Sequence, residues 1–228
     1  APLASIIQTA LPTGILKNRR ASQAIFTTSE SNASLIPTPA QAEIVNKIIN
    51  YPPQTHLLRG VTGSGKTTVY LELVRQAITA QQSAIIIIPE IALTTQLTQQ
   101  FTSQFKRVIV FHSNLTESAR HQIWQAILTA QEPVIIIGTR SSLFLPVQNL
   151  GLIVIDEAHE ISSLKQDKNP KYSSTQVASV LAKLHHARLI LGSATPLLSD
   201  YWFCEQKKCS LLELPDTALN ATPPRIEL

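Results

Sequence analysis

Methionine is absent from the 228-residue chain, and cysteine occurs only twice, as Cys204 and Cys209. Two cysteines are too few for a zinc site of their own, and one isolated pair does not make a disulfide framework. We therefore expect a reducing compartment in which both residues are ordinary core or surface cysteines. Because the chain starts at Ala1 without a methionine and stops at Leu228, it reads as a piece of a longer protein.

Long apolar runs are also missing. No stretch reaches the roughly 18 apolar residues that a membrane helix needs, and the N-terminus lacks the charge order of a signal peptide. We expect a cytoplasmic protein that does not enter the membrane. Charged residues make up 15% of the chain and the formal net charge is +4. That charge allows a polyanionic partner without indicating one.

Hydrophobic residues make up 44% of the chain, which predicts a globular core and excludes general disorder. The segment 17–34, "KNRRASQAIFTTSESNAS", is rich in Ser, Thr and Asn and has no period, as is typical of a linker. We expect an N-terminal segment and linker over residues 1–36 and the folded domain over residues 37–215. Residues 216–228 would begin the connection to the rest of the longer chain.

Short apolar runs alternate with helical patterns along the domain. The helical patterns run over 69–77, 123–128 and 177–184, and an opening helix has Thr38 as N-cap and Pro39 at its first position. Each run is apolar throughout, which is typical of strands covered on both faces. The sequence thus predicts an α/β fold with a parallel sheet sandwiched between helices. The expected strands are 55–58, 84–88, 108–111, 134–137, 152–155 and 188–191.

The segment "GVTGSGKT", residues 60–67, fits the phosphate-binding loop G-x-x-x-x-G-K-[ST] and lies between a predicted strand and a predicted helix. Its glycines allow backbone N–H groups to surround phosphates, Lys66 reaches the outer phosphates, and Thr67 can bind Mg²⁺. A glycine-rich turn that merely joins strand to helix is the alternative, which the context disfavours. The predicted nucleotide contacts are Gly60, Thr62, Gly63, Ser64, Gly65, Lys66, Thr67 and Thr68.

A second anchor is predicted in "LIVIDEAHE", where an apolar strand delivers Asp156 and Glu157 at its end. Asp156 would hold Mg²⁺ together with Thr67, and Glu157 would orient and deprotonate the attacking water. The alternative, an acidic helix N-cap after a strand, weakens once the upstream loop is considered. The sequence therefore predicts ATP and Mg²⁺ as cofactors, with Lys66, Asp156 and Glu157 as catalytic residues.

Four ordered segments carry a family resemblance: "GVTGSGKT", "IPEIALTTQL", "GTRSSLFLPVQNLGLIVIDEAHE" and "LGSATP". In this order and spacing they resemble the first motor lobe of superfamily 2 helicases, and most closely the PriA family of primosomal replication-restart helicases. The resemblance implies a RecA-like P-loop NTPase domain with a DEAH-box motif. It also implies an ATP-dependent 3′-to-5′ DNA helicase that acts as a monomer in the bacterial cytoplasm. Its partners would be forked or single-stranded DNA and replication-restart proteins.

The same resemblance assigns roles to further residues. Gln41 would read adenine, but Thr38 and Gln41 also form a capping-box pattern, and both interpretations stay open. His159, Ser193 and Thr195 would couple the nucleotide state to DNA grip, although a helix-start histidine can simply face solvent. A lone arginine such as Arg140 is also commonly a solvated surface charge. The DNA-binding residues implied are Thr94, Thr139, Arg140, Lys171 and Tyr172.

The sequence departs from the family at several positions. Thr68 and Ala158 stand where acids are usual, the loop after the acidic motif has few aromatic residues, and the linker is too short for a winged-helix domain. Zinc is implied only for the second lobe. A second lobe would also supply the arginine finger, so we expect this chain to bind Mg-ATP, turn it over slowly and unwind nothing. Rival interpretations are a restriction-type or RNA motor of the same superfamily, and a nucleotide-dependent docking module.

Overall fold

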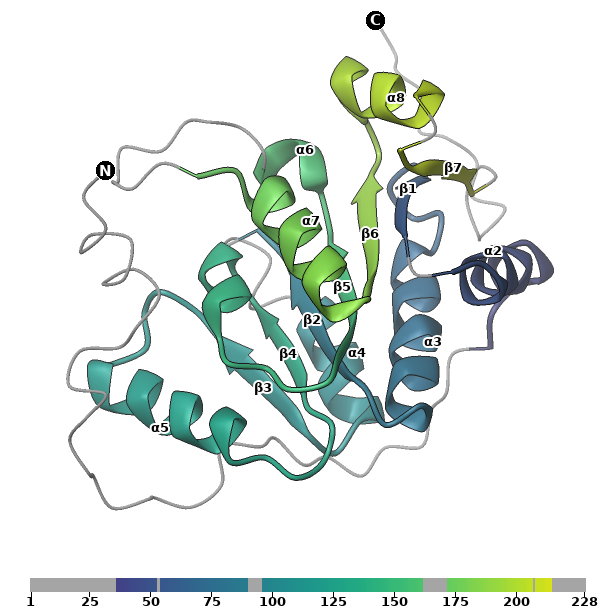
Figure 1. Ribbon diagram of the computed structural model, residues 1–228. Coiled ribbons are helices and arrows are strands. Elements are labelled where there is room, and N and C mark those ends of the chain that lie inside the picture. Colours follow the sequence, from purple (N-terminus) through teal and green to yellow (C-terminus); the bar gives the residue numbers. More distant parts are fainter. Residues whose placement is uncertain (1–35, 53, 90–95, 162–171, 207, 215–228) are drawn as a thin grey trace, which may run out of the picture.

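Parallel strands form the centre of the fold. The computed structural model describes residues 36–52, 54–89, 96–161, 172–206 and 208–214, and within these ranges seven strands pair in the order β3-β4-β2-β5-β6-β1-β7 (Figure 1). Every pairing is parallel. The strands are β1 (Thr55–Arg59), β2 (Ser83–Ile87), β3 (Val108–Phe111), β4 (Ile135–Gly138), β5 (Leu150–Ile155), β6 (Arg188–Ser193) and β7 (Ser210–Glu213).

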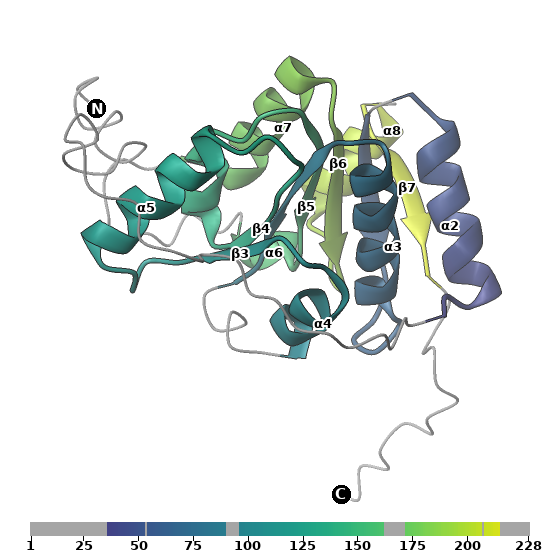
Figure 2. The ribbon, with the colours of Figure 1, turned by 90° about the horizontal axis from the view of Figure 1, so that it is seen from below.

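Helices cover both faces of this sheet, as Figure 2 shows. One face carries α2 (Pro39–Asn50), α3 (Lys66–Thr79) and α4 (Gln96–Gln104). The other carries α5 (Glu117–Leu128), the 3-10 helix η2 (Arg140–Phe144) and α7 (Ser174–His185). The short helices α6 (Ala158–Ile161) and α8 (Leu198–Glu205) follow β5 and β6. None of the helices in the described ranges is both long and apolar enough to cross a bilayer.

The core is divided by the sheet into two apolar layers. In β2, Ile86 packs in the layer beneath α2, α3 and α4, whereas Ile85 and Ile87 pack in the layer beneath α5 and α7. Successive side chains of a strand point to opposite faces, so a strand buried on both sides needs apolar residues throughout. The predicted parallel sheet between helices is confirmed. The predicted domain limits at residues 36/37 and 215/216 stay a prediction.

Only part of the apolar pattern over 177–184 faces the sheet in α7. Val180 and Leu184 are 59% and 70% exposed, while Ala178 and Ala182 are buried. Alanine at the contact lets the helix approach the strands closely. Val177 and Leu181 also pack against this core layer, whereas Val180 and Leu184 lie on the outer side. Leu128, at the end of α5, is likewise exposed. The predicted helical patterns over 123–128 and 177–184 therefore include exposed positions as well as positions that pack against the core.

The two cysteines also differ from the expectation. Cys204 in α8 and Cys209, just before β7, form a disulfide. The chain turns back after α8 and brings the two Cα atoms to 4.6 Å, within the range that a disulfide requires. The expectation of two ordinary cysteines is corrected, because the pairing depends on a turn that composition does not reveal.

A buried histidine in β1 predicts a dependence of stability on pH. His56 is 1% exposed, its Nδ1 lies 2.5 Å from Ser210 Oγ, and burial, followed by the charge of Arg188, lowers its pKa to about 4. The unfolded chain therefore binds a proton at a higher pH than the folded chain does. Stability from this residue is present above pH ~6.5 and is lost as the pH falls toward 4.

We expect the free energy of unfolding to fall by up to about 3 kcal/mol from this residue between pH 7 and pH 4. Urea denaturation of the wild type and of His56→Leu at both pH values measures it. The variant should lose less stability on acidification than the wild type. Equal losses in the two proteins would contradict the assignment.

Candidate nucleotide-binding site

Three of the sequence motifs meet at one edge of the sheet. The strands β5, β6 and β1 are neighbours and parallel, so their carboxyl ends lie side by side (Figure 1). The Gly60 amide donates to the Ser193 carbonyl at 3.1 Å, which ties the glycine-rich loop to the end of β6. Asp156 follows β5, the next strand in the sheet. This edge is where open α/β sheets bind ligands.

The loop between β1 and α3 has the form of a phosphate cradle. Gly63 and Gly65 have φ values of 82° and 85°, a region that residues with a Cβ seldom adopt. No atom lies within 4 Å of the position that a Cβ on Gly63 would occupy. The amides of Gly65, Lys66 and Thr67, at the start of α3, donate no hydrogen bond within the described part of the chain. Free amides at a helix N-terminus suit an anion.

Two polar side chains of this loop are buried. Lys66 is 8% exposed. Its Nζ donates to the Gly60 carbonyl at 2.8 Å, and the same Nζ lies 3.7 Å from Glu157 Oε1. The Oγ of Ser64 is buried and has no hydrogen-bond partner among the described residues. An unpaired buried hydroxyl is unfavourable unless something else satisfies it. A buried ammonium, an orphaned hydroxyl and free amides together fit a triphosphate.

The acidic pair lies across the loop from Lys66. Burial raises the pKa of the Asp156 carboxyl; a hydrogen bond from Tyr70 opposes the rise, and the charge of Glu157 adds to it. Glu157 has a φ of 48°, an uncommon value for a residue with a side chain. This conformation makes the sharp turn from β5 into α6. Backbone strain of this kind persists where surrounding structure enforces it, frequently at functional sites.

Tyr70 is a residue of this site that the sequence motifs missed. Its side chain is fully buried, its hydroxyl donates to Asp156 Oδ1 at 2.9 Å, and burial raises its pKa well above the usual range. The hydroxyl is therefore protonated and acts as a donor. Its spacing in the sequence could have indicated this place: Tyr70 lies three residues after Thr67 and four after Lys66, and residues at these spacings share one side of a helix.

The predicted coupling residues are brought together at the end of β6. His159 Nδ1 lies 2.8 Å from Ser193 Oγ and 3.5 Å from Glu157 Oε2. The Thr195 amide donates to Ser193 Oγ at 3.1 Å. The His159 side chain is 24% exposed. These contacts connect the acidic pair to the segment after β6, and the coupling role stays a prediction.

Gln41 takes part in a capping box and also contacts the loop. The Thr38 amide donates to Gln41 Oε1 at 2.9 Å, and the Gln41 amide donates to Thr38 Oγ1 at 3.4 Å. Its Nε2 donates to the Ser64 carbonyl at 3.3 Å. The capping-box interpretation is confirmed. A contact of Gln41 with adenine stays a prediction. The hydrogen bond to the Ser64 carbonyl connects α2 to the phosphate-binding loop.

The residues predicted to bind DNA fall partly within the described ranges. Arg140 opens η2 after β4, and its guanidinium lies 5.5 Å above the ring of Tyr172, which contacts Phe144 edge-on at 5.2 Å. Its Nη1 is buried without a hydrogen-bond partner among the described residues. Thr139 is buried, with Oγ1 3.2 Å from Ser141 Oγ. Thr94 and Lys171 lie outside the described residues.

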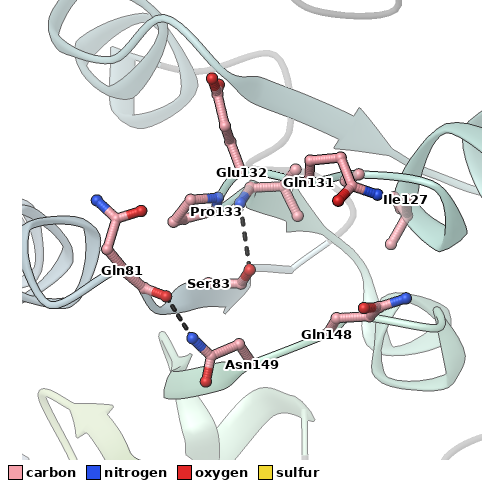
Figure 3. Close-up of a pocket in the computed structure, with 10 residues that line it drawn as sticks. Gln81, Ser83, Ile127, Gln131, Glu132, Pro133, Gln148 and Asn149 are labelled. Carbon is pink, nitrogen blue, oxygen red and sulfur yellow. Dashed lines mark hydrogen bonds between the residues drawn. The ribbon is translucent and has the colours of Figure 1, made fainter.

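A cavity of about 230 Å³ lies at the opposite edge, where β2, β4 and β5 begin (Figure 3). Its polar groups are largely engaged within the protein. Ser83 Oγ accepts from the Val134 amide at 3.2 Å, and the Asn149 side chain donates to the Gln81 carbonyl. Glu132 is paired with Arg107 at 2.6 Å. This cavity therefore offers less for chemistry than the edge that carries the three motifs.

Comparison with known proteins relates the chain to helicases. A family model described as DEAD/DEAH box helicase matches residues 38–201. The replication restart protein PriA of Synechocystis sp. is 37% identical over 99% of this chain and 28% of its own length. The PriA protein of Bacillus subtilis is 39% identical over 75% of this chain and 21% of its own length. The chain thus spans about a quarter of the length of these relatives.

Solved structures with the same fold are more distant in sequence. A DEAD box protein from Methanococcus jannaschii superposes with a TM-score of 0.56 at 17% identity, over 78% of this chain and 50% of its own. RecG bound to a three-way DNA junction superposes with a TM-score of 0.55 at 22% identity, over 79% of this chain and 24% of its own. These likenesses support the RecA-like fold.

Proposed function

The chain belongs to the DEAD/DEAH box helicase family, and on that premise we propose that it is the ATP-binding motor lobe of a 3′-to-5′ DNA helicase for replication restart. The observation that carries the proposal is that Lys66, at the start of α3, meets Asp156, Glu157 and Ser193 at the ends of the adjoining strands β5 and β6. The PriA relatives, named as replication restart proteins, support the choice of DNA and of restart factors as partners. A cytoplasmic location follows from that role.

Nucleotide binding would use the loop between β1 and α3. The amides of Gly65, Lys66 and Thr67 surround phosphate oxygens, and the Lys66 ammonium neutralises the outer phosphates. The Thr67 hydroxyl and the Asp156 carboxylate would hold Mg²⁺, which supplies positive charge for the triphosphate. Gln41 keeps the loop in place through the Ser64 carbonyl.

Hydrolysis would rest on Glu157. Its carboxylate lies 3.7 Å from the Lys66 ammonium, so a base stands beside the group that contacts the outer phosphates. Glu157 orients a water and accepts its proton. His159 lies between Glu157 and Ser193 and passes a change at the phosphates to the segment after β6. In this way the state of the bound nucleotide controls the affinity of the protein for DNA.

DNA binding would use Arg140 at the carboxyl end of β4. Tyr172 stacks on the guanidinium, and Arg140 as a whole is only partly buried at the end of the strand. A DNA phosphate satisfies such a group with a charge-assisted hydrogen bond. Arg140 therefore contributes to the affinity for DNA but does not distinguish between base sequences.

We expect Arg140→Ala to weaken binding to single-stranded and forked DNA by a similar factor for every sequence tested. The slope of log affinity against log salt concentration should fall by about one unit, because one phosphate contact is lost. Fluorescence anisotropy of a labelled fork, measured at several salt concentrations in the presence of Mg²⁺ and a non-hydrolysable ATP analogue, gives both quantities.

Lys183→Ala is the matched control, since it removes one exposed positive charge from the last turn of α7. This variant should keep the wild-type slope. An unchanged slope in Arg140→Ala would contradict the assignment of Arg140. Tighter binding of the wild type to RNA than to DNA of the same sequence would contradict the DNA helicase and favour an RNA motor.

A further inference from the structure

Tyr70 is a buried tyrosine that belongs to none of the sequence motifs, yet its hydroxyl contacts the acidic pair. Its exposed fraction is 0%, and it donates a hydrogen bond of 2.9 Å to Asp156 Oδ1. Phenylalanine would fill almost the same space in the core, so packing alone does not require the hydroxyl. A buried phenol also needs a partner. The hydrogen bond therefore indicates a role at the carboxylate.

The position of Tyr70 follows from the helix that the phosphate-binding loop opens. Lys66 and Thr67 start α3, and Tyr70 lies four and three residues after them. Residues at these spacings lie on the same side of a helix. Because α3 packs against the sheet beside β5, the phenol reaches the end of the strand that carries Asp156.

The next strand leaves room for the phenol. A Cβ on Gly192 of β6 would lie 1.7 Å from the Tyr70 hydroxyl oxygen and 3.4 Å from Asp156 Oδ1. A side chain of any size at position 192 would push the hydroxyl away from the carboxylate. Gly192 directly precedes Ser193, so α3, β5 and β6 converge on this hydrogen bond.

We propose that Tyr70 is a positioning residue that holds the Asp156 carboxylate in the orientation required for Mg²⁺, an inference that rests on the proposed nucleotide site. The phenol fixes one carboxylate oxygen and leaves the other to coordinate the ion. Partners that orient a metal ligand contribute about 10- to 100-fold to metal affinity. Tyr70 acts through Asp156 and contacts neither the ion nor the nucleotide.

The test is Tyr70→Phe, which removes the hydroxyl and keeps the ring. The affinity of a fluorescent ATP analogue is measured while Mg²⁺ is titrated, and again in EDTA. We expect the Mg²⁺ concentration for half-maximal binding to rise about tenfold or more, with the affinity in EDTA unchanged. Tyr51→Phe is the matched control, since Tyr51 is 57% exposed, and it should keep the wild-type Mg²⁺ requirement.

Gly192→Ala supplies a second variant that displaces the hydroxyl without removing it. It should raise the Mg²⁺ requirement in the wild-type background and have a smaller effect in Tyr70→Phe, because the two changes act on one hydrogen bond.

A wild-type Mg²⁺ requirement in Tyr70→Phe would overturn the inference about Tyr70 but would not contradict the proposed nucleotide site. Equal loss of affinity with and without Mg²⁺ would also overturn it, since that pattern indicates a role in folding. A wild type that binds no nucleotide in Mg²⁺ would overturn both proposals.

Discussion

Replacement of Lys66 by alanine should lower the affinity of the protein for Mg-ATP by about a hundredfold, equivalent to about 3 kcal/mol. The ammonium is 8% exposed and lies within the phosphate-binding loop, 2.8 Å from the Gly60 carbonyl. Alanine removes the charge-assisted contact that the buried ammonium would make to the outer phosphates. Turnover should fall below detection, because the phosphates lose their cation. Calorimetric titration with Mg-ATP measures the affinity.

Lys47→Ala is the control for the loss of a lysine. Lys47 pairs with Glu43 on the exposed side of α2, and a solvent-exposed pair of this kind contributes little to stability. Its affinity for Mg-ATP should equal that of the wild type. Wild-type affinity in Lys66→Ala, in a protein that unfolds at the wild-type temperature, would show that nucleotide does not bind in this loop.

Substitution of Glu157 by glutamine should separate binding from hydrolysis. Glutamine has nearly the same shape but accepts no proton, so turnover should fall about 10²- to 10⁴-fold. ATP affinity should stay within about threefold, because the substitution changes only the partly exposed contacts of the carboxylate with Lys66 and His159. Phosphate release under single-turnover conditions, with forked DNA present, measures the rate.

Glu205→Gln, at the exposed end of α8, removes one carboxylate away from the site and should turn over ATP as the wild type does. A nucleotide-dependent docking module would give a different pattern, with no turnover in the wild type and therefore none to lose in Glu157→Gln. Full turnover by the variant would show that Glu157 is not the general base and that another residue near the phosphate-binding loop accepts the proton.

Local motifs explain why much of the site could be predicted from sequence. The loop from Gly60 to Thr67 brings its own geometry, since its glycines and the helix it opens are adjacent in the chain. Asp156 and Glu157 follow a strand that is apolar throughout, and such strands are recognised without a partner. Parallel pairing then places the ends of β1, β5 and β6 at one edge. The fold class and the nucleotide site could therefore be predicted together.

Other features depend on contacts between distant segments and were missed. The strand order, with β7 added beside β1, is set by tertiary pairing, and β7 is only four residues long with alternating partial exposure. The helix α4, "QLTQQFTSQ", is mostly polar and carries little apolar signal. Tyr70 resembles any core aromatic residue until Asp156 and Gly192 are seen beside it. The disulfide likewise required the turn after α8.

The most direct test of the site is a crystal structure of Glu157→Gln with Mg²⁺ and ATP. The account predicts the triphosphate within the loop 60–67, with the amides of Gly65 and Lys66 on its oxygens and a single Mg²⁺ shared by Thr67 and the carboxylate of Asp156. A triphosphate bound elsewhere, or a Mg²⁺ that Asp156 neither contacts nor reaches through one water, would contradict it.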